Sequence, residues 1–345
     1  MEKIIISTPD SVSAIIIGAK WEAVVKLLPE SGVVIITDYN VFDHYASGFP
    51  DFPVLKIKPG EQSKQLKVVE NLSKKLLDIG LDRSGFLLGI GGGVVCDISG
   101  FIASVYMRGI RCGFVSTSLL SQVDASTGGK NGVNIGLIKN IIGNFKQPEF
   151  VVCDTSMLLT LPDDEYYSGL AELIKTGIIG DKTIIDILED NYKGIINRDK
   201  NILSDLVSRA VKFKASIVSK DEKESGLRRV LNFGHTFGHA IELNEAVKHG
   251  FAVASGIKLA TYFSLKKGLI KEADYNRIFG LLKKYKLSAD YPISIEKMGN
   301  FLIHDKKKSG RDINFVFTKG IGKAVVKKIP VKEVIDFYRD FKSVK

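Results

Sequence analysis

The chain has 345 residues, of which 45% are hydrophobic, and its formal net charge is +10. This length supplies a packed core and favours two domains over one. The lysines are spread out and no aromatic–basic interleaving is present, so we expect an anionic small substrate and no nucleic-acid partner. No apolar run reaches the roughly 18 residues of a membrane-spanning helix, and the N-terminus does not resemble a signal peptide, so we expect a cytoplasmic protein without a membrane partner. The three scattered cysteines form neither a disulfide framework nor a CxxC metal motif.

In the first half of the chain, short β-branched runs alternate with helical segments. This alternation favours a parallel sheet with helices on its faces. We expect strands at residues 3–7, 14–18, 33–37, 53–57, 86–90, 111–116 and 150–153, and helices at 20–28, 64 to about 79 and 97 to about 107.

After Asp154 the pattern becomes mostly helical. We expect helices at 163–179, 183–196, 200–221, 229–243, 250–268, 273–285, 294–303 and 331–342, with a short hairpin of strands at 314–318 and 324–329. The predicted architecture is therefore an α/β Rossmann-like domain at 1–157 followed by a mostly α-helical domain at 158–345.

Two turns that follow predicted strands have the composition of ligand-binding loops. Gly91-Gly92-Gly93-Val94 leads from a strand into a helix, the layout in which backbone amides cradle a pyrophosphate. The strict GxGxxG fingerprint fails at Val94, and a tight turn with positive φ is the alternative. Thr37-Asp38-Tyr39-Asn40 either belongs to the same binding edge or forms a turn and helix cap. No acidic residue stands at the end of the strand after the glycine turn to bind a ribose.

The densest polar stretch of the first half covers residues 117–134. It is too rich in glycine and asparagine for regular structure and too charged for the core. We therefore expect an irregular, functional loop there, with Lys139 and Asn140 close behind it.

The segment from Arg229 to Gly250 contains three of the five histidines. His235 and His239 are four residues apart and share one face of a helix, and His249 follows. Histidines that converge in this way indicate a divalent metal site, with zinc favoured, that lacks one oxygen ligand. A polar helix face with hydrogen-bonded histidines is the alternative.

Glu172 is the candidate for the missing oxygen ligand, because it lies in an apolar part of the helix at 163–179. A carboxylate in such surroundings must be paired, protonated or bound to a metal. A buried ion pair with Lys175, three residues on, explains it equally well.

Several segments together resemble one family, the 3-dehydroquinate synthases of the sugar-phosphate cyclase superfamily. They span about residues 38 to 315 in the family's order. The matching pieces are PGEQSK (59–64), GGGVVCDISGF (91–101), YMRG (106–109), TSLLSQVDASTGGKNGVN (117–134), KNIIG (139–143), LPDDEYYSGLAELIKTG (161–177), GLRRVLNFGHTFGHAIE (226–242), HG (249–250) and DKK (305–307).

The resemblance implies an NAD+-binding domain, a helical domain, and an active site between them that holds NAD+ and Zn2+, with Co2+ as the alternative metal. It places the metal on Glu172, His235 and His249, and turns His239 toward the substrate. The implied NAD+ contacts are Asp38, Asn40, Glu61, Lys64, Gly92, Gly93, Val94, Asp97, Thr117, Ser118, Asp124, Lys130, Lys139 and the loop after Cys153. The implied substrate contacts are Arg108, Asp124, Lys130, Asn140, Lys175, Lys214, Arg228, Asn232, His239, Lys306 and Lys307. Arg108 is expected to reach a neighbouring subunit's site, which implies a homodimer.

The family's reaction accounts for these residue types. Its substrate is 3-deoxy-D-arabino-heptulosonate 7-phosphate, which carries a carboxylate and a phosphate. NAD+ transiently oxidises the C5 hydroxyl, phosphate leaves, the ketone is reduced again, and an aldol step closes the ring to 3-dehydroquinate. The enzyme is therefore a lyase of the shikimate pathway and not a net oxidoreductase. The residues implied to be catalytic are Asp124, Lys130, Lys175, Arg228 and His239.

The sequence also departs from the family pattern. Phe251 stands where the family usually has Glu, so an acidic partner of a metal-bound histidine is expected to be missing. Ser116, Asn131 and Cys96 replace a usual Pro, Thr and small residue.

Three rival functions remain for the same architecture. A sister cyclase, such as a 2-deoxy-scyllo-inosose or valiolone-type synthase, acts on a sugar phosphate without a carboxylate, and it leaves the carboxylate-binding pair Lys214 and Arg228 unexplained. A glycerol-dehydrogenase-like enzyme leaves the substrate lysines Lys130 and Lys175 unexplained. A non-catalytic homologue rests only on Phe251.

Overall fold

The structure is a computed structural model that describes residues 1–136, 138–245, 247–291, 293–304 and 308–343. It divides into two compact units. Unit 1 consists of Met1–Tyr166 and Gly194–Lys223, and unit 2 consists of Tyr167–Lys193 and Glu224–Lys345. Within the described ranges, none of the helices combines the length and the apolar character needed to cross a membrane.

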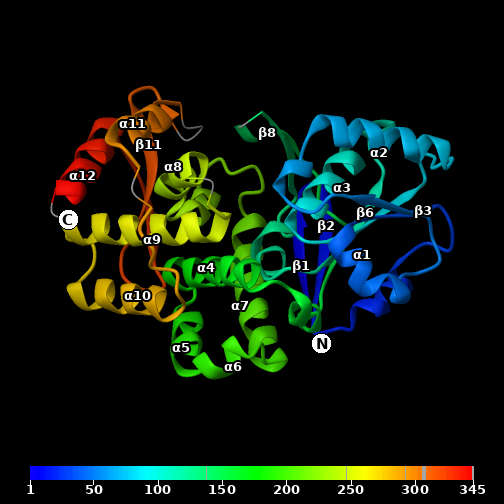
Figure 1. Cartoon of the computed structure of the whole chain (residues 1–345), viewed down its shortest axis with the longest axis horizontal. Helices are drawn as coiled ribbons and strands as arrows, with labels where there is room; N and C mark the ends of the chain where they lie inside the picture. Colours follow the sequence, from blue (N-terminus) through cyan, green and yellow to red (C-terminus); the bar gives the residue numbers. More distant parts are fainter. Residues whose placement is uncertain (137, 246, 292, 305–307, 344–345) are drawn as a thin grey trace. The chain divides into compact units, whose positions relative to one another are not determined.

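Unit 1 is built on a seven-stranded sheet whose order is β1-β2-β9-β6-β5-β3-β4 (Figure 1). Neighbouring strands run parallel except for β1 and β2, which form an antiparallel hairpin. The strands are β1 (Glu2–Thr8), β2 (Ser11–Ile17), β3 (Val33–Asp38), β4 (Val54–Ile57), β5 (Phe86–Gly91), β6 (Arg111–Ser116) and β9 (Phe150–Cys153). The expected α/β sheet is confirmed, and every strand predicted for it is present.

Helices cover both faces of this sheet. On one face, Phe86, Leu88 and Ile90 of β5 pack with Trp21 of a 3-10 helix (Trp21–Leu27), and Val41 of α1 (Tyr39–Tyr45) packs against this cluster. On the other face, Ser99 of α3 (Gly93–Val105) packs against Gly89 of β5. Helix α2 (Leu66–Asp78) contacts α3. Because β5 is buried on both faces, its sequence is an unbroken apolar run without alternation.

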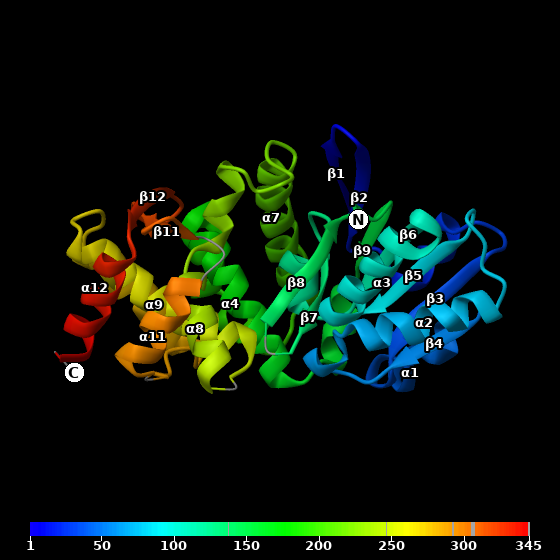
Figure 2. The ribbon, with the colours of Figure 1, turned by 90° about the horizontal axis from the view of Figure 1, so that it is seen from above.

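The prediction of an irregular loop at residues 117–134 is partly wrong. Its last residues form β7 (Lys130–Ile135), which pairs with β8 (Ile138–Phe145) in an antiparallel hairpin beside the main sheet (Figure 2). Most side chains of β8 are exposed, so the sequence shows no alternation of apolar and polar residues. The segment before the hairpin is helical at Ser121–Ala125.

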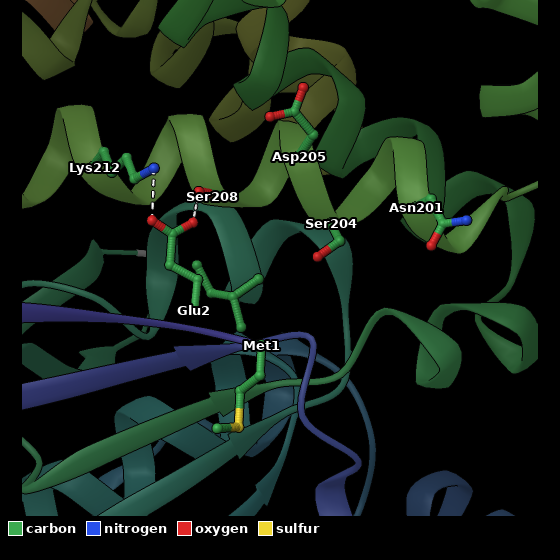
Figure 3. Close-up of a pocket in the computed structure, with 8 residues that line it drawn as sticks. Met1, Glu2, Asn201, Ser204, Asp205, Ser208 and Lys212 are labelled. Atoms are coloured by element: carbon green, nitrogen blue, oxygen red, sulfur yellow. Dashed lines mark hydrogen bonds and ion pairs between the residues drawn. The ribbon is translucent and has the colours of Figure 1, made fainter.

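Helix α7 (Lys200–Val218) packs within unit 1 although it follows the first helix of unit 2 in sequence. Figure 3 shows the carboxylate of Glu2 on β1 between two side chains of α7. Ser208 donates a hydrogen bond to Oε2 of Glu2, and Nζ of Lys212 lies 2.6 Å from Oε1. The packing units therefore do not coincide with a single boundary at 157/158, because α7 contacts β1. The shallow pocket of about 310 Å³ beside this contact contains none of the predicted site residues.

Unit 2 is mostly helical and adds a small antiparallel sheet. Its core is aromatic: the rings of Phe263 and Phe337 stack with centroids 4.1 Å apart, and Phe237 packs against both Phe315 and Phe337. The helices that build or enter it are α4 (Asp163–Ile179), α5 (Lys182–Asp190), α6 (Tyr192–Ile196), α8 (His235–Glu245), α9 (His249–Lys266), α10 (Glu272–Lys284), α11 (Ile295–His304) and α12 (Val331–Ser343). The strands are β10 (Lys308–Ser309), β11 (Asp312–Thr318) and β12 (Ala324–Pro330).

Two differences in unit 2 concern helix boundaries. The helix expected at 183–196 is broken between α5 and α6, with Asn191 closing α5. The helix expected from 229 begins only at His235, because a 3-10 turn (Leu227–Asn232) and Gly234 with φ of +79° precede it.

Candidate active-site residues

Glu172, His235 and His249 lie together in unit 2 and come from three helices. Glu172 is on α4, His235 begins α8 and His249 begins α9. Oε1 of Glu172 lies 3.7 Å from Nε2 of His235 and 3.5 Å from Nε2 of His249. These three residues each offer one ligand atom, and the atoms all lie within 4.8 Å of one another.

Two glycines allow the three helices to approach closely enough for this convergence. A Cβ on Gly250 would lie 2.3 Å from the backbone of Ser168 on α4, and a Cβ on Gly256 would lie 2.1 Å from the carbonyl oxygen of Gly234. Ser168 Oγ also accepts a hydrogen bond of 2.8 Å from the amide of Gly250. The helix start that carries His249 is thereby fixed against the helix that carries Glu172.

Both histidines of this set are held through their second ring nitrogen. Nδ1 of His235 lies 3.1 Å from the carbonyl oxygen of Phe233, and Nδ1 of His249 lies 3.3 Å from Oε2 of Glu242. Because a carbonyl and an ionised carboxylate only accept hydrogen bonds, both partners favour a proton on Nδ1. In the neutral ring that binds a metal, the lone pair of each Nε2 would then face Glu172, as in metal-binding histidines.

Two of the three distances between the ligand atoms fit a tetrahedral ion. A metal about 2.1 Å from each ligand places neighbouring ligand atoms about 3.4 Å apart, close to the two distances from Oε1 of Glu172. Glu172 is fully buried, and among the described residues no donor makes a hydrogen bond to its Oε1. Such a carboxylate oxygen requires a cation beside it to offset its desolvation. In the metal-free protein the imidazole of His249, 3.5 Å away, serves as that cation, and a metal ion would take its place.

The alternative predicted for Glu172, an ion pair with Lys175, is present at the same time. Nζ of Lys175 contacts Oε2 of Glu172, and the lysine is itself buried. Lys175 thus occupies one carboxylate oxygen and leaves the other turned to the histidines. Burial lowers the pKa of His249, but the carboxylates of Glu172 and Glu242 outweigh it and raise that pKa to about 10 in the metal-free protein.

His239 shares a helix face with His235, as predicted, and their ring centroids are 5.0 Å apart. It also belongs to a second group of three that could hold an ion, with Glu242 and His249. In that group, however, Glu242 lies at hydrogen-bond distance from Nδ1 of His249. In the first group Oε1 of Glu172 lies near both Nε2 atoms and has no hydrogen bond from a described residue, so this group is the better candidate for a metal site.

The prediction that Phe251 leaves a metal-binding histidine without an acidic partner is wrong for His249. Glu242, on the preceding helix, supplies a carboxylate to it. Glu242 is not among the residues predicted from the sequence, although it stands seven residues after His235 and therefore on the same face of α8.

The other predicted residues of unit 2 have different environments. Arg228 is buried in the 3-10 turn before α8, and Asn232 at the end of that turn donates a hydrogen bond to Glu224. Lys306 and Lys307 lie outside the described residues.

In unit 1 the glycine-rich turn has the predicted layout. Strand β5 ends at Gly91, Gly92 precedes the first turn of α3, and Gly93 and Val94 begin the helix. Gly92 and Gly93 have no side chain above the amides of this turn, and Val94 is partly exposed. The amides at the start of α3 can therefore bind an anion.

A cluster of polar side chains lies around Lys64, which is only 3% exposed. Its Nζ lies 2.6 Å from Oδ2 of Asp97 and 2.5 Å from Oδ1 of Asn140, and 3.8 Å from Oε1 of Glu61. Glu61 also accepts a hydrogen bond of 2.8 Å from Asn134. Burial raises the pKa of Asp97, and the charge of Lys64 opposes this. Four residues that were predicted as ligand contacts thus meet here.

Asp38 stands at the end of β3, which is the direct neighbour of β5 in the sheet. Its Oδ1 accepts a hydrogen bond of 3.0 Å from the amide of Val41, so it caps α1. Asn40 in the first turn of α1 is exposed. An acidic residue therefore does end a strand beside the glycine turn. This strand precedes the turn in the chain, whereas the sequence prediction considered only the strand that follows the turn.

The remaining predicted residues of unit 1 fall into three groups. Thr117 and Ser118 follow β6, and the amide of Thr117 donates a hydrogen bond of 3.0 Å to the carbonyl oxygen of Gly91 in the neighbouring strand. Asp124 contacts the buried Lys214 of α7. The last group consists of residues with exposed side chains, namely Arg108, Lys130 and Lys139. The backbone of Arg108 has a positive φ of 66°.

Comparison with known proteins places both halves of the chain in one family. Residues 54–168 match the family model of the 3-dehydroquinate synthase N-terminal region, and residues 169–308 match that of the C-terminal region. A 3-dehydroquinate synthase of Dictyoglomus thermophilum is 41% identical over 307 residues, covering 87% of this chain and 86% of that protein. One of Thermoanaerobacter pseudethanolicus is 41% identical over 327 residues, covering 91% and 92%.

Solved structures show the same fold at lower identity. A 2-deoxy-scyllo-inosose synthase complexed with carbaglucose-6-phosphate, NAD+ and Co2+ superposes with a TM-score of 0.86 at 24% identity, covering 98% of this chain and 99% of that one. A 2-epi-5-epi-valiolone synthase from Streptomyces hygroscopicus with NAD+ and Zn2+ bound gives 0.87 at 24% identity, covering 96% and 97%. The chain belongs to the 3-dehydroquinate synthase family.

Proposed function

We propose that the chain carries out the 3-dehydroquinate synthase reaction with NAD+ and one divalent metal ion, Zn2+ or Co2+, held by Glu172, His235 and His249. The function predicted from the sequence is confirmed at the level of the family and of its curated relatives. The observation that carries the metal proposal is the fully buried carboxylate of Glu172, whose Oε1 faces two histidine Nε2 atoms and accepts no hydrogen bond from a described residue.

Glu172, His235 and His249 would hold the ion with three ligands, which would leave a coordination position for substrate. When bound, the ion acts as a Lewis acid on substrate hydroxyls. Around the ion, Lys175 neutralises the second oxygen of Glu172, and the ring of His239 lies beside that of His235.

We place NAD+ on unit 1. The amides at the start of α3 are suited to its pyrophosphate, and Asp38 beside that turn is suited to a ribose hydroxyl. When bound, NAD+ supplies a hydride acceptor that is regenerated within the reaction. Lys64 with Asp97 and Asn140 forms a fixed polar group near the start of the same helix, since Asp97 lies on its first turns.

Buried cations support an anionic substrate with two acidic groups. Lys214 in unit 1, Lys175 and Arg228 in unit 2 are each less than a tenth exposed. Lys175 and Lys214 contact the carboxylates of Glu172 and Asp124 in the structure, and an arginine such as Arg228 can bind a carboxylate or phosphate bidentately. These residues favour the heptulosonate over the sugar phosphates of the sister cyclases, which are similar to this chain only at lower identity.

We further propose a homodimer in which Arg108 of each subunit serves the site of the other. Its support is local: Met107 and Arg108 adopt positive φ values of 49° and 66°, and the side chain of Arg108 is exposed. Non-glycine residues rarely adopt this conformation, and they concentrate at functional sites.

Removal and return of the cofactors tests the proposal. Protein stripped of metal by a chelator and of nucleotide by gel filtration is expected to release no phosphate from 3-deoxy-D-arabino-heptulosonate 7-phosphate. Activity should return only when both a divalent ion and catalytic NAD+ are added. Full activity of protein verified to be metal-free would contradict the metal centre, and consumption of NAD+ in step with phosphate would contradict the lyase.

A further inference from the structure

Glu242 is a buried carboxylate that the proposed reaction does not use. It lies on α8, is 8% exposed, and places Oε2 3.3 Å from Nδ1 of His249. On the other side of the same ring, Nε2 of His249 lies 3.5 Å from Oε1 of Glu172. The imidazole is therefore held between two carboxylates, one at each nitrogen.

We propose that Glu242 is the positioning residue of the metal centre: it accepts the Nδ1 proton of His249 and thereby directs the Nε2 lone pair at the ion. This inference rests on the metal site of the proposed function. It assigns a role to a residue that touches neither metal nor substrate.

The two histidines of the set show why His249 needs this partner. His235 is fixed by the carbonyl oxygen of Phe233, only two residues before it, so its own turn sets the ring. His249 is the first residue of α9, and the backbone there is held by the contact of Gly250 with Ser168. That contact fixes the position of the helix but leaves the imidazole free to rotate about χ1 and χ2, and Glu242 selects one orientation and one tautomer.

The charges in the centre favour the same role. Glu172 carries one negative charge, and Lys175 at its Oε2 cancels much of it. A second buried carboxylate behind His249 restores the negative charge that attracts a divalent ion, and it makes the imidazole a stronger electron donor. Outer partners of this kind are worth about 10- to 100-fold in metal affinity.

The competing role for Glu242 is that of a ligand, because His239, Glu242 and His249 form the second group that could hold an ion. The two roles predict different responses to removal of the charge alone. A glutamine at position 242 can still accept the Nδ1 proton through its amide oxygen, but it is a poor metal ligand.

The experiment measures Zn2+ dissociation constants by competition with a chromophoric chelator, and the absorption spectrum of the Co2+-loaded protein. The variants are Glu242→Gln, Glu242→Ala and Glu172→Gln, with Glu245→Gln as the matched control, an exposed acid on the same helix. Thermal unfolding of each metal-free variant shows that the fold is retained.

We expect wild type and Glu245→Gln to bind one ion per chain equally tightly. Glu242→Gln should keep the stoichiometry and the Co2+ spectrum with binding weakened up to about tenfold, and Glu242→Ala should lose about 10- to 100-fold with altered Co2+ bands. Affinity of Glu242→Ala equal to wild type would overturn the inference while the metal site stands. Loss of binding by Glu242→Gln as complete as that of Glu172→Gln would make Glu242 a ligand instead. Absence of binding in wild type would refute the metal site itself.

Discussion

At the scale of single residues, the metal proposal depends on the unusual position of Glu172. A carboxylate without exposed surface is costly in a protein interior, and Lys175 offsets only one of its oxygens. The other oxygen and two histidine nitrogens converge at distances that a tetrahedral ion would bridge. The metal proposal therefore rests on a buried carboxylate oxygen that no described residue satisfies by a hydrogen bond.

Glu172→Gln should weaken Zn2+ binding by more than about 100-fold, because a direct ligand contributes more than an outer partner. The dissociation constant from chelator competition measures this. The same substitution removes a buried negative charge next to Lys175, so the metal-free variant should unfold at a lower temperature than wild type. Unchanged zinc affinity would exclude Glu172 from the centre.

Arg228→Ala should raise KM for 3-deoxy-D-arabino-heptulosonate 7-phosphate by about 10- to 100-fold, since a hydrogen bond to a charged group contributes about 1.5–3 kcal/mol. Steady-state phosphate release measures KM and kcat. The neighbouring Arg229, partly exposed in the same 3-10 turn, offers a matched control as Arg229→Ala. Equal KM values for wild type and Arg228→Ala would remove the main argument for a carboxylate substrate.

The three cysteines should be inert in the folded protein. Burial raises the pKa of Cys112 and of Cys153 to about 12, and that of Cys96 well above its usual value. A thiol with a pKa of about 12 is thiolate in roughly one molecule in 10⁴ at pH 8. A chromogenic thiol reagent should therefore react slowly with the native protein. In denaturant it should react readily with all three thiols. Rapid reaction of a native thiol would contradict the burial of these strands and of α3.

At the scale of elements, the site exists because α4, α8 and α9 pack at glycine contacts. Which helices form could be predicted from sequence periodicity. Glu172 could be predicted as a ligand from its apolar surroundings, and the choice of His235 and His249 over His239 depended on the family resemblance. The role of Glu242 could not be predicted, because its contact with His249 depends on how α8 packs against α9. The β7–β8 hairpin was missed for a related reason: its exposed strands carry no alternating pattern and are defined by their pairing.

Gly250→Ala tests the contact between α9 and α4. The new Cβ would meet the backbone of Ser168, which cannot move aside as a side chain can, so we expect a loss of about 1–3 kcal/mol in the free energy of unfolding and weaker zinc binding through displacement of His249. The control is Gly280→Ala within α10, where a Cβ meets no atom within 4 Å among the described residues. That change should stabilise by about 0.5–1 kcal/mol. Urea unfolding and chelator competition measure both effects, and a neutral Gly250→Ala would contradict the close approach.

At the scale of the whole molecule, the candidate residues are shared between two packing units. The anion-binding turn, Asp38 and the cluster at Lys64 belong to unit 1, and the metal set with Arg228 belongs to unit 2. The chain order hides this division, since α7 with Lys214 follows α5 but packs on β1. Alternation of strand and helix predicted the sheet, whereas the return of the chain to unit 1 depends on long-range packing such as Glu2 with Ser208.

The proposed homodimer gives a complementation test. Arg108→Ala and Lys130→Ala should each be inactive, but after subunit exchange each hybrid dimer contains one site with both residues intact. With random exchange of equal amounts, about a quarter of all sites should recover. Exchange is confirmed with differently tagged chains. Absence of recovery in verified hybrids would contradict a shared site.

The most direct test of the central claim compares phosphate release from 3-deoxy-D-arabino-heptulosonate 7-phosphate and from glucose 6-phosphate, with Zn2+ and catalytic NAD+, while NADH absorbance is followed. We predict release from the heptulosonate only, formation of 3-dehydroquinate and no net NADH. Release from glucose 6-phosphate alone would move the chain to a sister cyclase, and net accumulation of NADH would identify a dehydrogenase. Either result would contradict the proposed 3-dehydroquinate synthase function.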